Sequence, residues 1–110
     1  MTGTIPESTG NLKNLSQLNL QNNNFHGTIS ESLGNLVNLR SIYLSKNRLS
    51  GKLTDAMIEK WTQLQESTFS SNSFAGNIPS KWSQQLITLD LSNNQFTGQI
   101  PSSIFDLPNL

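Results

Sequence analysis

The chain has 110 residues, enough for one domain, and its seven Lys and Arg balance seven Asp and Glu. This neutral charge argues against nucleic acid or an anionic membrane surface as a partner, because both require a basic footprint. The absence of cysteine excludes a disulfide framework, a thiolate metal site and a cysteine nucleophile. No secretory leader follows Met1, and no apolar run approaches the ~20 residues of a membrane-spanning helix.

One pattern recurs four times: apolar-x-apolar-x-x-Asn-x-apolar-x-Gly-x-apolar. The copies cover residues 18–29, 42–53, 67–78 and 89–100, and the third copy has Ser67 in its first apolar position. The anchoring residues are Asn23, Asn47, Asn72 and Asn94, so successive copies are 24, 25 and 22 residues apart. A period in the twenties with this pattern is typical of a leucine-rich repeat solenoid.

The pattern resembles the plant-type leucine-rich repeat, whose consensus continues as Leu-Ser-Gly-x-Ile-Pro and then Leu-Gly-x-Leu. Leu49-Ser50-Gly51, Ile78-Pro79, Ile100-Pro101 and Leu33-Gly34-Asn35-Leu36 match this consensus. The resemblance spans nearly the whole chain. It implies an α/β repeat fold: a right-handed horseshoe arc of about four to five repeats, with a parallel β-sheet on the concave face and short helical or extended turns on the convex face.

Taken in order, residues 1–110 form one leucine-rich repeat domain. Its expected units are a partial repeat over 1–11, repeats over 12–35, 36–60, 61–82 and 83–106, and a partial repeat over 107–110. Neither end carries the polar capping repeat that covers a solenoid core. We therefore expect an uncapped fragment whose parent chain holds further repeats or caps.

The Leu18-x-Leu20 alternation predicts a short strand that pairs in parallel with its later copies. Its outward positions form three columns: Gln17/Ser41/Glu66/Thr88, Asn19/Tyr43/Thr68/Asp90 and Gln21/Ser45/Ser70/Ser92. Tyr43 is the only aromatic residue among them, and an exposed tyrosine is a frequent hot-spot residue. We expect the ligand-binding residues on this concave face to be Gln17, Asn19, Gln21, Arg40, Ser41, Tyr43, Lys46, Glu66, Thr68, Thr88, Asp90 and Ser92.

The recurring asparagines lie where each strand ends and the chain turns inward. An asparagine amide can satisfy peptide groups that the turn leaves unpaired, so we predict a structural ladder of Asn23, Asn47, Asn72 and Asn94. Ser45, Ser70 and Ser92 are expected to add side-chain bonds beside it. The glycines of the repeat, at 27, 51, 76 and 98, are expected where the chain turns closely past itself, and a Cβ there would be costly if φ is positive.

The third repeat is irregular. Residues 54–61 predict a short helix with Thr54 as N-cap and with Met57, Ile58 and Trp61 on its inner side. In the following strand, Ser67 brings a polar group into an inward position. We expect Trp82 to fill space in the core and the irregular connections to bend the array locally.

Catalytic and metal sites are not predicted. His26 lacks partners at defined spacing and reads as an exposed turn residue, and the seven carboxylates are scattered. The repeat explains every glycine, so no phosphate-binding loop and no cofactor are expected. Asn14-Leu15-Ser16 is the only acceptor motif for N-glycosylation, and it matters only if the chain is secreted, as the resemblance implies.

The resemblance implies recognition of a protein or peptide by the concave sheet, within a plant receptor-like ectodomain in signalling or defence. Such an ectodomain is extracellular and its parent chain is membrane-anchored; no enzymatic activity, nucleic acid or membrane insertion of this segment is implied. One alternative is inhibition of a secreted hydrolase, as polygalacturonase-inhibiting proteins do, although the few charges here disfavour it. A second is ice binding, which would need regular ranks of Thr, Ser or Asn on an outer face.

Overall fold

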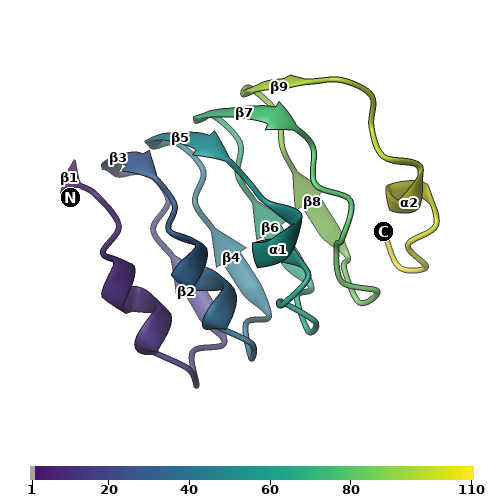
Figure 1. The fold of residues 1–110 in the computed structure, drawn as a ribbon, viewed down its shortest axis with the longest axis horizontal. Helices are drawn as coiled ribbons and strands as arrows, with labels where there is room; N and C mark the ends of the chain where they lie inside the picture. Colours follow the sequence, from purple (N-terminus) through teal and green to yellow (C-terminus); the bar gives the residue numbers. More distant parts are fainter. Residues whose placement is uncertain (1) are drawn as a thin grey trace.

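The computed structural model describes residues 2–110 as a solenoid of stacked coils (Figure 1). Each coil runs through a short strand, turns, passes through a second strand, and returns along a helix or an extended segment. The molecule measures 36 × 31 × 21 Å along its principal axes. Two parallel sheets and a layer of short helices therefore enclose one continuous apolar core, as the repeat pattern predicts.

The first sheet, which we call the concave sheet, contains β2 (Gln17–Asn19), β4 (Ser41–Tyr43), β6 (Glu66–Thr68) and β8 (Thr88–Asp90) in that order. All pairs are parallel, and the register aligns Gln17, Ser41, Glu66 and Thr88 in one column. A second column aligns Asn19, Tyr43, Thr68 and Asp90. The column alignment expected from the sequence is thus the observed register.

The second sheet contains β1 (Thr2–Gly3), β3 (Asn24–Thr28), β5 (Arg48–Lys52), β7 (Ser73–Asn77) and β9 (Gln95–Thr97). The repeat pattern predicted turns here, and that prediction was wrong: His26, for example, lies in β3. These segments are rich in Gly, Asn and Ser, which disfavour strands. They pair because each coil brings its backbone into register with the next coil.

The glycines that recur along the second sheet have positive φ, and they also make room for the preceding repeat. Gly51 has φ +85°, and a Cβ on it would lie 2.7 Å from Thr28 Cγ2. At Gly76 a Cβ would lie 3.1 to 3.3 Å from the methylene stem of Lys52. The side chain that directly follows each of these glycines, Thr28 after Gly27 and Lys52 after Gly51, therefore lies against the glycine of the next strand.

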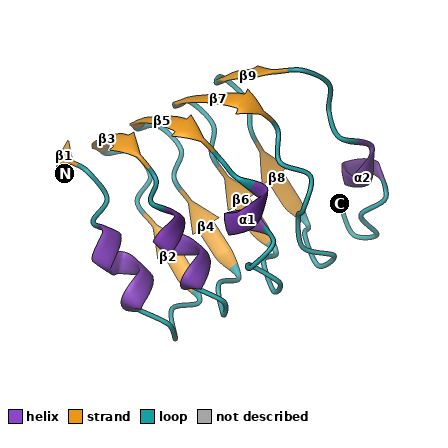
Figure 2. Cartoon of the chain, viewed as in Figure 1, coloured by secondary structure: helices purple, strands orange, loops and turns teal. Residues whose placement is uncertain are grey.

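The remaining elements are the 3₁₀ helices η1 (Glu7–Asn11) and η2 (Glu31–Asn35) and the α-helices α1 (Asp55–Ile58) and α2 (Ser102–Phe105) (Figure 2). The predicted helix over 54–61 is present in a shorter form as α1. Thr54 caps α1 because its Oγ1 accepts a hydrogen bond from Met57 N at 3.3 Å. Met57, Ile58 and Trp61 are buried, as the sequence predicted.

The centre of the core contains large side chains from the repeat over residues 61–82. Phe69 and Phe74 pack edge-to-face with ring centroids 5.9 Å apart, and Trp82 lies 6.1 Å from Phe69. The Trp61 indole Nε1 donates to the Leu33 carbonyl oxygen at 2.9 Å, which joins the segment after α1 to η2.

Ser67 takes an inward position and is fully buried. Its hydroxyl donates to the Thr88 carbonyl oxygen at 3.3 Å, so the polar group expected in this apolar position has a partner.

The hydrogen bonds that the asparagine column predicts are present. Asn47 Nδ2 donates to the carbonyl oxygens of Leu44, at 3.0 Å, and of Leu20 in the preceding repeat, at 2.9 Å. Asn47 Oδ1 accepts from the Phe25 amide at 3.1 Å. Equivalent bonds from Asn72 and Asn94 extend the ladder along the edge of the concave sheet.

Asn23 Nδ2 donates to the carbonyl oxygens of Leu20 and Gln21 at 3.0 and 3.1 Å. Each ladder asparagine follows a residue in the left-handed region: Asn22, Lys46, Ser71 and Asn93, with φ of 56° to 61°. The turn thus has the same backbone conformation in all four repeats.

Candidate ligand-binding face

The side chains expected to bind a ligand lie on the concave sheet or directly beside it. Seven are exposed: Gln17, Asn19, Gln21, Arg40, Lys46, Thr88 and Ser92. Five are half-buried: Ser41, Tyr43, Glu66, Thr68 and Asp90. The third column continues past the strands, because Asn22 N donates to Ser45 O and Lys46 N to Ser70 O, each at 3.0 Å. The face is therefore three columns wide, although Ser45 in the third column is buried.

Tyr43 and Glu66 form the central contact of this surface. The Tyr43 hydroxyl donates a hydrogen bond to the Glu66 carboxylate across the β4–β6 pair. This bond stabilises the protonated form of the Tyr43 phenol and therefore raises the pKa of Tyr43 above its usual value. The one aromatic side chain of the face is thereby fixed in orientation, which reduces the entropy that a ligand contact would otherwise cost.

Asp90 is held as a carboxylate on the neighbouring strand β8. Its Oδ1 accepts from the Ser92 hydroxyl at 2.7 Å and from the Ser92 amide at 3.1 Å. The hydroxyl bond is the first cause, and the amide bond the second, of a lowered pKa for Asp90. Ser92 therefore bonds to Asp90, whereas Ser70 Oγ donates to Ser45 Oγ at 2.9 Å beside the ladder.

Thr68 contributes less polarity to the face than its column position predicts. Its Oγ1 is inaccessible to solvent and has no hydrogen-bond partner among residues 2–110. The part of the half-buried side chain that a ligand could touch is therefore not its hydroxyl oxygen.

The two cations of the candidate set lie at opposite ends of β4. Arg40 precedes the strand and Lys46 follows it, so the structure does not bring them together. The candidate set lacks two residues of the Arg40 column, Gln65 on the next coil and Ile87 on the one after it. Gln65 N donates to Arg40 O at 2.8 Å and Ile87 N to Gln65 O at 2.7 Å, which places all three in one column. All three residues directly follow a leucine of the repeat, and this shared position was the signal in the sequence that could have identified the column.

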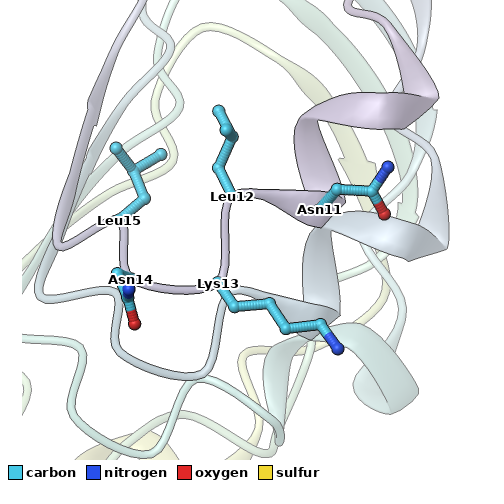
Figure 3. Close-up of a pocket in the computed structure, with 5 residues that line it drawn as sticks. All are labelled: Asn11, Leu12, Lys13, Asn14 and Leu15. Atoms are coloured by element: carbon cyan, nitrogen blue, oxygen red, sulfur yellow. The ribbon is translucent and has the colours of Figure 1, made fainter.

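No group of three or more His, Asp and Glu within residues 2–110 could hold a metal ion. In the same range no helix has the length and apolar character to cross a bilayer. A hollow of about 400 Å³ is lined by Asn11, Leu12, Lys13, Asn14 and Leu15 (Figure 3), between η1 and β2 rather than on the concave sheet.

Comparison with known proteins identifies the repeat. The family model described as Leucine Rich Repeat matches residues 14–36, 38–58 and 85–107, more than half of the chain. The chain is 38% identical over 114 residues to the receptor-like protein kinase BRI1-like 3 of Arabidopsis thaliana. That match covers 99% of this chain and 10% of the relative, so the chain spans about a tenth of the relative's length.

Solved structures give the same assignment. The crystal structure of PEPR1–AtPEP1 matches with a TM-score of 0.93 and 41% identity, over 99% of this chain and 16% of that one. The Arabidopsis receptor kinase HAESA, in complex with the peptide hormone IDA and the co-receptor SERK1, matches with a TM-score of 0.92 and 34% identity, over 99% and 18%. The chain belongs to the leucine-rich repeat family and is similar to the plant receptor-like proteins within it.

Proposed function

We propose that the chain is a recognition segment of a plant receptor-like ectodomain, and that it binds a protein or peptide on its concave sheet without making or breaking bonds. The observation that carries this proposal is the aligned set of exposed polar side chains around Tyr43. Support also comes from the similarity to receptor kinases, one of them solved with a peptide hormone. By the same similarity, we propose an extracellular location at the cell surface.

The mechanism is binding by a rigid surface. The parallel register fixes the spacing of the columns, and the bond from Tyr43 to Glu66 fixes the aromatic anchor. The carboxylates of Glu66 and Asp90 suit a ligand that carries hydrogen-bond donors, since an ionised carboxylate only accepts. A ligand lying across β4, β6 and β8 would contact these groups together.

A displayed library of linear peptides, panned against the chain, tests this function. Tyr43→Ala should weaken the selected peptides about thirtyfold, because a hot-spot aromatic contributes about 2 kcal/mol or more. Glu59→Ala on the helical side is the matched control and should leave the dissociation constants unchanged. Equal binding by the Tyr43→Ala variant and the parent would show that the binding site does not lie on this face.

The two alternatives have less support than recognition, although a plant ice-binding protein of known structure also matches with a TM-score of 0.85 and 32% identity, over 94% of this chain and 34% of that one. Ice binding needs regular ranks, yet the residue that begins each strand of the second sheet changes from strand to strand: Asn24, Arg48, Ser73 and Gln95. Hydrolase inhibition would favour a charged cluster, and Arg40 and Lys46 lie at opposite ends of β4.

A further inference from the structure

We propose that Asn14 carries an N-linked glycan when the chain is secreted, and that this glycan covers one edge of the solenoid. Asn14-Leu15-Ser16 is a complete acceptor motif. The structure adds where this motif lies and what its side chains contact. The inference does not depend on which ligand the concave sheet binds.

Asn14 lies at an exposed turn between η1 and β2. Backbone bonds from Lys13 N to Asn11 O and from Leu15 N to Leu12 O, both 2.9 Å, hold this turn. Leu12 and Leu15 point together into the hollow, while the Asn14 side chain leaves the turn on another side (Figure 3). The backbone of the turn is therefore held in place without a hydrogen bond from the Asn14 side-chain amide.

The next repeat provides an internal comparison. Its equivalent residue, Asn38, donates Nδ2 to the Lys13 carbonyl oxygen at 3.0 Å. By contrast, the side-chain amide of Asn14 makes no hydrogen bond within residues 2–110. Replacing one of its amide hydrogens by a sugar thus breaks no contact of the folded chain.

The second required residue, Ser16, is also free to serve. Its backbone oxygen accepts from Arg40 N at 2.8 Å and from Ser41 N at 3.1 Å. Its side-chain hydroxyl is exposed and takes no part in these bonds. The hydroxyl can therefore be removed by substitution without loss of the pairing that begins the concave sheet.

The reaction is a glycosyl transfer from a lipid-diphosphate-linked oligosaccharide, the co-reactant that the secretory pathway supplies. Asn14 Nδ2 attacks the anomeric carbon of the first sugar, and a carbon–nitrogen bond forms as the bond from that carbon to the diphosphate oxygen breaks. The lipid diphosphate leaves with the bonding electrons, and Nδ2 loses one proton. No oxidant or reductant is needed.

The position of the glycan has a consequence for partners. The return turns at residues 11–15 and 36–39 lie on the edge opposite the asparagine ladder (Figure 1). A glycan on Asn14 covers the edge formed by the return turns at the first repeat. It leaves the ladder edge and Tyr43 accessible. A protein partner can therefore approach over the concave sheet or the ladder edge without meeting the glycan.

The test is secretion of the chain from plant cells behind a cleavable signal peptide, followed by treatment with a peptide-N-glycosidase that also cleaves plant-type glycans. The parent and Ser16→Thr should lose mass on treatment, with Asp replacing residue 14. Asn14→Gln and Ser16→Ala should show no change, while the nearby control Asn11→Gln should behave as the parent. Both cellular and secreted pools are measured, because transfer precedes export.

Two results would overturn the proposal: an unchanged mass of the parent after treatment, or a change that persists in Asn14→Gln. Peptides selected on the concave sheet should bind the parent and Asn14→Gln with the same dissociation constant. A changed affinity would contradict the placement of the glycan away from Tyr43, even if Asn14 is glycosylated.

Discussion

Asn47 joins two neighbouring repeats through a single side chain. It donates to Leu20 and Leu44 and accepts from Phe25, so its removal leaves several turn peptides without partners. Asn47→Ala should lower the free energy of unfolding by about 1–3 kcal/mol, measured by urea denaturation. Asn35→Ala, at an exposed position of η2, is the control. Superimposable unfolding curves for Asn47→Ala and the parent would reject the structural role of the ladder.

Asp90 makes stability depend on pH at the acidic end. Its pKa is lower in the folded chain than in the unfolded chain, so the stability it contributes is present above about pH 4 and is lost as the pH falls through the lowered value. Ser92→Ala removes the hydroxyl bond, keeps the amide bond, and should move the pKa of Asp90 back toward its ordinary value.

An NMR titration of the Asp90 carboxyl carbon measures this shift. Ser102→Ala, at the start of the remote helix α2, should leave the titration of Asp90 as it is in the parent. If Ser92→Ala behaves in the same way as Ser102→Ala, the hydroxyl bond does not set the pKa.

At the scale of elements, η1 and η2 pack closely because Gly10 has no side chain. A Cβ on Gly10 would lie 2.3 Å from the backbone oxygen of Ser32, whose hydroxyl bonds to Glu7 O at 2.8 Å. Gly10→Ala should therefore push the helices apart and cost about 1–3 kcal/mol.

Gly34 provides the comparison, because its nearest neighbour would be the flexible Lys60 side chain at 3.2 Å, followed by Met57 Cα at 3.3 Å. Gly34→Ala should cost less than Gly10→Ala in the same urea experiment. The reverse order would show that the close approach at Ser32 relaxes freely.

The sequence predicted some elements well and missed others for physical reasons. The Leu18-x-Leu20 alternation specifies a half-buried strand, and its copies defined the observed columns. The second sheet could not be read in this way, because Gly27 and Gly51 interrupt the alternation and pairing comes only from stacking of the coils. The bond between Ser92 and Asp90 depends on side-chain orientation, which no spacing encodes.

At the scale of the whole molecule, an apolar hollow of about 240 Å³ lies open at the last repeat. It is lined by Ile78, Leu89, Leu91, Ile100, Ile104 and Leu110. Exposed apolar patches promote association, so we expect the isolated chain to self-associate with rising concentration in sedimentation experiments.

Ile100→Lys should shift this equilibrium to the monomer, because Ile100 is 55% exposed and lines the hollow. The control is Ile87→Lys, which changes an equally exposed residue, at 54%, beside the concave sheet. A parent chain that sediments as a monomer at every concentration would refute the expected association.

The asparagine ladder also couples the unfolding of each coil to that of its neighbours. Each strand of either sheet pairs only with strands of adjacent coils, and each bond of Asn47, Asn72 and Asn94 reaches no further than the preceding coil. Opening of one coil thus weakens its immediate neighbours first, as in a one-dimensional chain of coupled units. Amide hydrogens beside the fully buried Phe69 and Phe74 should exchange slowly, and exchange should quicken outward toward the half-buried Phe96.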